Sequence, residues 1–340
     1  MTSRRGRTAT TAGTLALALA GSTLSGCGLL DGSSRLEKAL EYLPADTRTV
    51  LFVDRAQVAD RVDLDDLTTG GSEDDVRRWA EATKGEAYGT ELARWLVPMQ
   101  EAAFSDFDVE WEVVGTDDGG ISRIWRMSDD LDFEKVAADL EDAGYERSGS
   151  KDRPVFKADL SDTEDGLVGG RYPIPPLEIA LVPGEELIVT GTRIDDILAA
   201  VDDDADSLAD KGSFGDLLGQ ADHQDDLEYA ALGLDAPCAP ADEPDAKGEG
   251  LGLFVPSDEE VRAVRLFDTD AAAEADAAAL EDALTAFGER SGVDLADEVT
   301  TDGRAVRVET GFDERAVLAQ AYVRQEGPFG CPANAPSPGA

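Results

Sequence analysis

The apolar residues Val109, Trp111 and Val113 alternate with glutamates along the chain. An alternation with a period of two residues is typical of a strand that buries one face. Turn residues at 117–120 then lead into an apolar run over 121–127, and this order predicts a hairpin. Further strands are predicted over residues 50–53, 155–156, 177–182, 186–190, 229–234, 251–255, 261–267 and 306–308.

Helical spacing of apolar residues predicts the helices between these strands. Ser72 and Asp75 have the spacing of a capping box, and an apolar stripe that includes Trp79 follows them. Residues 92–99 have the same helical spacing, with Pro98 either kinking this helix or starting it again after a break. The remaining predicted helices cover residues 133–140, 194–201 with caps at Thr192 and Asp195, 270–287, and a last helix through Val317 and Leu318 with a cap at Asp313.

The first 27 residues have the layout of an export signal. Three arginines at positions 4, 5 and 7 precede a short apolar stretch that ends near Ala20, which is too short to span a bilayer. The residues Leu24, Ser25, Gly26 and Cys27 follow, and they resemble the lipobox of bacterial lipoproteins. This resemblance implies that a diacylglyceryl group, with acyl chains such as palmitate, is attached to the thiol of Cys27 and that the chain is cleaved just before this residue. The alternative is an ordinary secretory signal with an incidental cysteine.

Hairpins with covering helices predict an α+β fold with mostly antiparallel sheets. The segments 123–126 and 262–265 are similar and lie about 140 residues apart, which leaves open whether two β-rich units are duplicated. The expected organisation is a lipoprotein signal peptide at 1–26, a lipidated cysteine and tether at 27–34, an N-terminal strand and helical segment at 35–106, α+β units at 107–226 and 227–327, and a Pro-rich tail at 328–340.

The two cysteines other than Cys27 are Cys238 and Cys331, an even number in a chain expected to be exported. Because exported proteins fold in an oxidising compartment, we expect these two cysteines to form a disulfide. The disulfide would close a loop of about 94 residues, and in the chain-entropy model a loop of that length stabilises the fold by roughly 4–5 kcal/mol. Two free thiols are the alternative.

Composition narrows the function classes. The chain has 340 residues, 42% of them hydrophobic, and a net charge of −43, so a real core can form and full disorder is excluded. So negative a chain is unsuited to neutralising phosphates, and we expect no nucleic-acid partner. Because residues 1–26 hold three arginines and no acid, their removal changes the charge to −46. The body is then expected to stand off an anionic membrane and to touch it only through the lipid.

Catalytic and metal-binding patterns are weak. The single histidine, His223, excludes a multi-histidine metal site and argues against a histidine-based triad. Asp202, Asp204 and Asp206 alternate as in a calcium loop, but serines occupy the sixth and twelfth positions, where glycine and glutamate belong. A solvated loop is the ordinary explanation. We therefore expect no enzyme activity, no cofactor and no designed metal site.

The body resembles a family of uncharacterised exported proteins and lipoproteins of actinobacterial envelopes. The resemblance rests on the LPADT segment at 43–47 and on the stretch 187–218, where LIVTG, IDDILAAV and SLAD follow one another. It implies an extracytoplasmic location and no established activity.

The sequence thus predicts a lipoprotein on the extracytoplasmic face of the cell membrane. The first hypothesis is a noncatalytic protein that binds an unknown envelope protein or ligand. The second is a carrier of a lipid or small hydrophobe in an internal cavity, which some of the four tryptophans would line; the ordinary role of these tryptophans is core packing. The third is a hydrolase that uses carboxylates.

Overall fold

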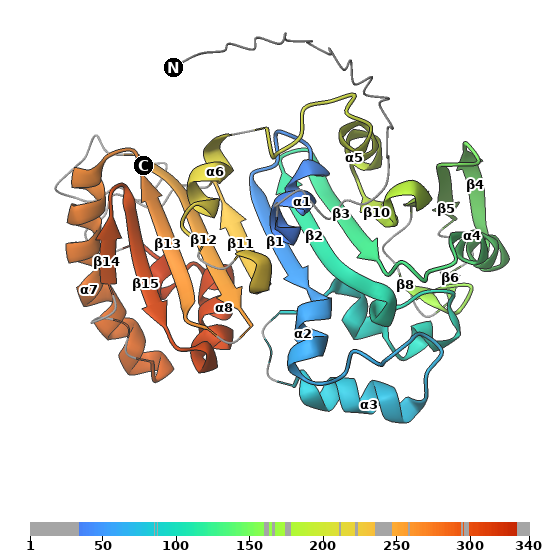
Figure 1. Ribbon diagram of the computed structural model, residues 1–340, viewed down its shortest axis with the longest axis horizontal. Helices are drawn as coiled ribbons and strands as arrows, with labels where there is room; N and C mark the ends of the chain where they lie inside the picture. The colour runs from blue at the N-terminus through green and yellow to red at the C-terminus, as the bar shows by residue number, and fades with distance from the viewer. Residues whose placement is uncertain are drawn as a thin grey trace, which may run out of the picture. The chain divides into compact units, whose positions relative to one another are not determined.

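One antiparallel sheet of 12 strands runs through the described part of the protein (Figure 1). The structure is a computed structural model. It describes residues 34–84, 86, 88–159, 163–164, 167–173, 178–210, 212–221, 224–234, 247–257, 259–293, 295 and 299–331.

The strand order is β14-β15-β13-β12-β11-β1-β2-β3-β10-β9-β5-β4. The strands are β1 (Thr49–Asp54), β2 (Val109–Asp117), β3 (Gly120–Met127), β4 (Tyr145–Gly149), β5 (Pro154–Ala158), β9 (Glu178–Val182), β10 (Leu187–Gly191), β11 (Leu227–Gly233), β12 (Gly248–Pro256), β13 (Val261–Phe267), β14 (Val299–Asp302) and β15 (Ala305–Thr310). A small second sheet contains β6 (Thr163–Glu164), β7 (Leu167–Val168) and β8 (Tyr172–Pro173).

Eight α-helices accompany the sheet in the described residues, and the predicted α+β fold is confirmed. They are α1 (Arg35–Glu41), α2 (Arg55–Arg61), α3 (Glu73–Ala82), α4 (Phe133–Asp142), α5 (Ile194–Val201), α6 (Gly212–Leu218), α7 (Asp270–Ser291) and α8 (Arg315–Arg324). Short 3-10 helices are η1 (Glu91–Trp95), η2 (Pro98–Glu101), η3 (Asp106–Asp108), η5 (Pro183–Glu185), η6 (Gln224–Asp226), η8 (Phe312–Glu314) and η9 (Gly327–Phe329).

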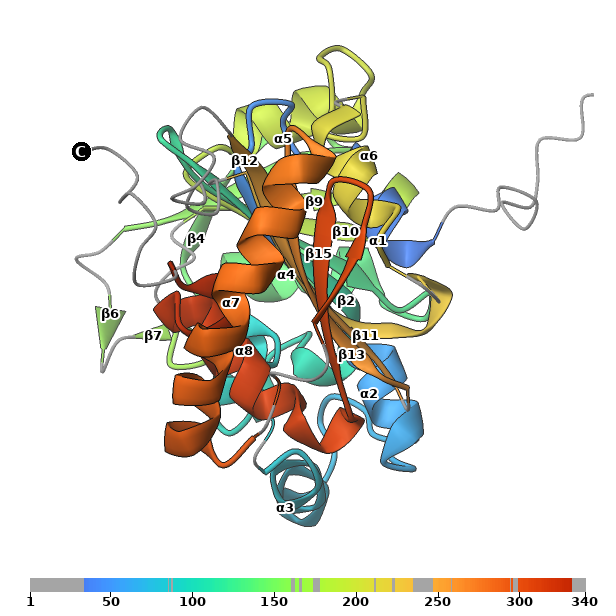
Figure 2. The ribbon, with the colours of Figure 1, turned by 90° about the vertical axis from the view of Figure 1, so that its left-hand side faces the viewer.

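Helices lie on both faces of the sheet (Figure 2). On one face, α1, α5 and α6 pack over apolar side chains that include Phe52 and Ile124. On the other face, α7 and α8 cover the half of the sheet that contains Leu253 and Val306. The rest of that face is covered by α4 and the segment with η1 and η2, around the fully buried Trp125. The core therefore consists of apolar layers on either side of the sheet.

The order of elements occurs twice along the chain. The series α1-β1-β2-β3-α4-β9-β10 is followed by α6-β11-β12-β13-α7-β14-β15, and both series add strands outward from the central β1–β11 pair. The first series also contains α2 and α3 between β1 and β2, and β4, β5 and the small sheet between α4 and β9. The similar segments 123–126 and 262–265 lie on the corresponding strands β3 and β13, but they are out of step by one residue. Ile124 faces α1 and α5, whereas its aligned partner Ala263 faces α7.

Several local predictions are confirmed and others are wrong. The capping box at Ser72 and Asp75 starts α3 as predicted. The helix predicted over 92–99 is instead the pair of 3-10 helices η1 and η2, and Pro98 starts the second one, because proline fits the first turn of a helix. The strand predicted to be half-buried at 109–113 is β2, which is covered on both faces, so that Glu112 is buried as well.

The predicted caps of the two later helices are also corrected. The N-cap of α5 is Arg193, whose side chain makes no hydrogen bond to the first turn of the helix. The predicted cap residue Thr192 instead accepts a hydrogen bond from the backbone N–H of Ile121 through its hydroxyl. The N-cap of α8 is Glu314, because Asp313 lies within η8. Among the tryptophans, Trp79, Trp111 and Trp125 are buried in the core and Trp95 packs partly buried against it.

A buried ion pair fixes α7 to the sheet. Arg265 of β13 is 1% exposed and Asp276 of α7 is fully buried. The guanidinium donates from Nε to Oδ2 at 2.7 Å and from Nη2 to Oδ1 at 2.9 Å. Its third nitrogen donates to the carbonyls of Pro328 and Gly330 at 3.1 and 2.8 Å. One arginine therefore holds a strand, a helix and the C-terminal segment.

We expect Asp276→Ala to lower the free energy of unfolding by about 3–5 kcal/mol, because the substitution leaves a buried guanidinium without its counter-ion. The matched control is Asp74→Ala, which removes an exposed pair with Arg77 and is expected to cost less than about 1 kcal/mol. Urea unfolding followed by circular dichroism measures both values. Equal losses for the two variants would show that the buried pair contributes no more than the exposed one.

Candidate functional site

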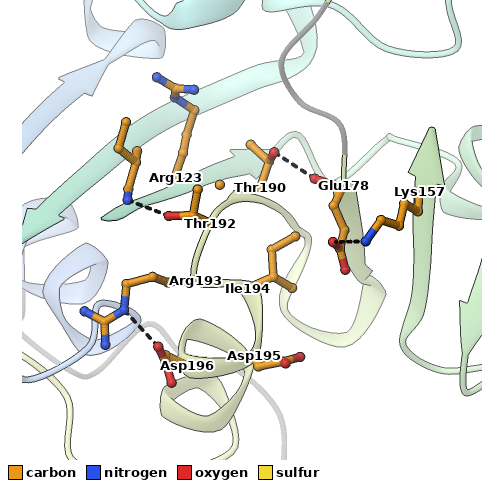
Figure 3. Close-up of a pocket in the computed structure, with 11 residues that line it drawn as sticks. Arg123, Lys157, Glu178, Thr190, Thr192, Arg193, Ile194, Asp195 and Asp196 are labelled. Atoms are coloured by element: carbon orange, nitrogen blue, oxygen red, sulfur yellow. Dashed lines mark hydrogen bonds and ion pairs between the residues drawn. The ribbon is translucent and has the colours of Figure 1, made fainter. Parts of the chain in front are cut away.

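An open hollow of about 620 Å³ lies where the β2–β3 hairpin meets the loop between β10 and α5 (Figure 3). Eight of its eleven described lining residues have polar or charged side chains, although carbon atoms make up more of the exposed wall than polar atoms do. The lining residues are Ile121, Arg123, Lys157, Glu178, Thr190, Gly191, Thr192, Arg193, Ile194, Asp195 and Asp196.

Two glycines allow the hairpin and the loop to approach so closely. Gly191 has a φ of +123°, and a Cβ there would lie 2.1 Å from the carbonyl oxygen of Ile121. Gly120 has a φ of +141°, and its Cβ would lie 1.8 Å from the hydroxyl of Thr192. Larger residues would be strained at both positions. The contact is completed by a hydrogen bond from the Thr192 N–H to the Ile121 carbonyl at 2.9 Å.

Arg193 is the electrostatic centre of this end of the sheet. Its side chain is 12% exposed and forms ion pairs with Asp46, Asp117 and Asp196. Desolvation lowers the pKa of Arg193, but hydrogen bonds to the three carboxylates outweigh it and raise this pKa above the ordinary value. The three aspartates come from the LPADT turn, the β2–β3 hairpin and α5, so Arg193 holds these segments together.

The two stretches that carry the actinobacterial resemblance meet beside this cluster. Leu208 donates its N–H to the carbonyl of Leu43 at 2.8 Å, and Ala45 donates to the carbonyl of Asp206 at 3.2 Å. Pro44 and Ser207 form an isolated antiparallel bridge between the same two segments. The LPADT and SLAD motifs therefore form one local structure.

Charged groups of both signs surround the hollow. Lys157 and Glu178 lie 3.5 Å apart and are 70% and 40% exposed, so both reach solvent. The hydroxyl of Thr190 donates to the carbonyl of Glu178 at 2.8 Å. Figure 3 shows this group across the hollow from Arg193 and Asp196. The site therefore offers hydrogen-bond donors and acceptors on opposing walls.

Arg123 lines the hollow and also forms an ion pair with the buried carboxylate of Glu112. Arg123 Nε lies 3.8 Å from Glu112 and has no hydrogen-bond partner in the described part of the chain. Glu112 accepts hydrogen bonds from the indole N–H of Trp125 and from the backbone N–H of Glu91. Burial raises the pKa of Glu112 to about 7, although Arg123 and these donors act in the opposite direction.

The lining offers binding groups rather than an activated nucleophile. It contains no cysteine, serine or histidine, and both of its threonine hydroxyls are already hydrogen-bonded. A hydroxyl or thiol nucleophile would need a free base beside it. The charged side chains of the described lining can form hydrogen bonds to a polar molecule.

The residues singled out in the sequence lie away from this hollow. Leu24, Ser25, Gly26, Cys27, His223 and Cys238 fall outside the described residues. Cys331 is disulfide-bonded, but its pairing with Cys238 stays a prediction because that residue is not described. Asp202, Asp204 and Asp206 are exposed, and Asp202 pairs with Arg153. The described residues contain no group of three side chains able to hold a metal ion.

Glu112 leads to a prediction for the pH dependence of stability. Its folded pKa of about 7 lies above the ordinary 4.5, so the folded state binds the proton more tightly than the unfolded state. The stability that this group contributes is complete below about pH 4.5 and is lost as the pH rises through 7.

We expect Glu112→Gln, which copies the neutral form, to gain about 3 kcal/mol relative to the wild type between pH 4.5 and 8. Chemical unfolding at several pH values tests this expectation. The control is Glu146→Gln at an exposed position of β4. A pH-independent difference between Glu112→Gln and the wild type would contradict the raised pKa.

Comparisons with known proteins add no family. No family model matches the chain, and no curated protein matches it. Among solved structures it is similar to crystal form I of TP0453, with a TM-score of 0.42 and 7% identity over 83% of this chain and 96% of that one. Crystal form III of the same protein gives a TM-score of 0.36 with 8% identity over 83% and 97% of the two chains. Likenesses at this level carry no inference about fold or function.

Proposed function

We propose that the protein is a lipid-anchored binding protein on the extracytoplasmic face of the cell membrane, and that the hollow beside Arg193 holds its ligand. The ligand is a polar molecule with both hydrogen-bond donors and acceptors. The observation that carries this proposal is that both walls of the hollow carry charges of both signs: Lys157 and Glu178 on one side, and Arg193 with Asp195 and Asp196 on the other (Figure 3). Its walls are held by strands and by the Arg193 cluster, so the binding groups are positioned in advance.

The N-terminal sequence supports the anchor. Cys27 follows the lipobox-like residues Leu24, Ser25 and Gly26, and the first described helix begins at Arg35, after a cap at Ser34. Acylation of one cysteine with two or more chains would give stable attachment. None of the helices in the described ranges has the length and apolarity needed to cross a bilayer.

The alternatives from the sequence receive less support. A lipid carrier needs a large apolar cavity, whereas the hollow described here is open and is lined by five charged side chains from Lys157 to Asp196 together with Arg123. A hydrolase needs carboxylates whose pKa values are pushed apart. Nothing described for Glu178, Asp195 and Asp196 favours acid–base hydrolysis over the binding of a ligand.

The anchor is tested by Cys27→Ser, which removes the acylated thiol. We expect the variant to move from the membrane fraction to the soluble fraction and to lose incorporation of labelled fatty acid. Ser33→Ala is the control, since it changes a side chain of the tether and keeps the Cys27 thiol. Unchanged membrane association of Cys27→Ser would refute the anchor.

The binding site is tested by thermal-shift measurements with amino acids, disaccharides, nucleotides and polyamines as probes. We expect a polar probe to raise the Tm, and the rise to disappear in the double variant Lys157→Ala and Asp195→Ala. The control variant Lys84→Ala and Glu289→Ala changes exposed charges on α3's C-terminal turn and on α7. A shift that survives the first double variant, or a lipid that copurifies in equal amount with the protein, would contradict the proposal.

A further inference from the structure

Arg55 is buried at the start of α2, and it precedes every lining residue of the hollow by more than 60 positions in the sequence. Its side chain is 7% exposed, and its guanidinium carbon lies 4.4 Å from the ring centre of Trp79 and 5.4 Å from that of Phe107. The neighbouring carboxylate belongs to Asp106, which is 1% exposed. The distance from Arg55 Nε to Asp106 Oδ2 is 3.7 Å, too long for a hydrogen bond.

The polar atoms of this pair are not satisfied by the described protein. Arg55 Nε and Nη2 and Asp106 Oδ2 have no hydrogen-bond partner among the described residues, whereas Asp106 Oδ1 accepts from the hydroxyl of Thr90. In Arg265 and Arg315 the same two nitrogens bind a carboxylate side-on, one nitrogen to each oxygen. The corresponding side of Arg55 has the geometry for a carboxylate and holds none from the described chain.

A small cavity adjoins these atoms. It measures about 70 Å³, and the exposed Gly89 is among its lining residues. Its walls include Arg55, Trp79, Tyr88, Thr90 and Asp106, together with Glu86, whose carboxylate is paired with Arg61 and Arg315. At roughly 10–15 Å³ for each water, this volume suits a molecule of about five non-hydrogen atoms.

The charges around the cavity limit what can occupy it. Burial lowers the pKa of Arg55 and raises that of Asp106, and the attraction between the two groups does not offset this desolvation for either one. A simple anion would be attracted to Arg55 but repelled by Asp106. A simple cation would be attracted to Asp106 but repelled by Arg55. A zwitterion satisfies both groups at once.

We propose that this cavity binds a small zwitterionic α-amino acid of the size of glycine or alanine. Its carboxylate accepts hydrogen bonds from Arg55 Nε and Nη2, and its ammonium group donates to Asp106 Oδ2. The indole of Trp79 forms the apolar wall. This cavity shares no lining residue with the hollow beside Arg193, so experiments can refute one of the two proposed sites without affecting the other.

Isothermal titration calorimetry of the full chain with glycine, acetate and methylammonium tests the proposal. We expect saturable binding of glycine at millimolar concentration. Acetate and methylammonium each lack one of the two charges and are expected to bind at least tenfold more weakly. L-leucine is expected to bind more weakly than glycine, because its side chain exceeds the cavity.

Two variants separate the site from general destabilisation. Arg55→Lys keeps the charge but loses the paired donors and is expected to weaken glycine binding at least tenfold. Arg77→Lys, at an exposed position of α3, is the matched control and is expected to bind as the wild type does. Ala93→Leu fills the cavity and leaves both charges in place, so it decides the matter if Arg55→Lys does not fold.

Three results would overturn the proposal. The first is no binding of glycine to the wild type, which would leave the pair solvated by water alone. The second is acetate binding as tightly as glycine, which would indicate a simple anion site. The third is glycine binding that is unchanged in the folded Arg55 and Ala93 variants.

Discussion

The pairing of β1 with β11 is the backbone contact on which the 12-stranded sheet depends. Five residue pairs, from Thr49 with Gly233 to Val53 with Tyr229, join the first series of strands to the second. Because the pairing is antiparallel and central, every other strand is added outward from it. Side chains strengthen the same junction, since Arg61 of α2 pairs with the fully buried Glu228 of β11.

Arginines hold this acidic protein together at a few defined points. The chain has 73 acidic residues and 30 basic ones, so the placement of the arginines matters more than the number of acids. Arg193 gathers three aspartates from three segments, and Arg265 holds a helix, a strand and the C-terminal segment. Arg315 and Arg61 share Glu86 across α8 and α2. Arg55 differs from all of these, because its paired donors have no partner within the described chain.

Much of the fold could be predicted from the sequence, because strand alternation and turn residues are local signals. The predicted strand 261–267 matches β13, and the hairpin after residue 117 matches β2 and β3. The helices α1, α2 and α6 were missed because seven residues make only about two turns, and the strands β4 and β14 were missed because their residues are mostly polar. The single sheet could not be foreseen either, because the pairing of β1 with β11 joins residues that are distant in the chain.

The hollow and the Arg55 cavity could not be predicted for a related reason. Their residues come from strands, loops and helices that only the tertiary fold brings together. In a chain with 73 acidic residues, an aspartate such as Asp106 or Asp196 has no local mark that separates it from a solvated one. The one usable signal was the pair of motifs LPADT and SLAD, whose contact places Asp46 beside Arg193.

The strand order also decides how this sheet meets its neighbours. Growth outward from a shared centre leaves two free edges, β4 and β14, whose unpaired backbone groups could template pairing with another chain. Both edges are short and mostly exposed, with Glu146 and Arg147 on one and two threonines and an aspartate on the other. Charged and polar side chains on short edge strands discourage such pairing. The short polar edges therefore disfavour edge-to-edge pairing between crowded copies of this chain.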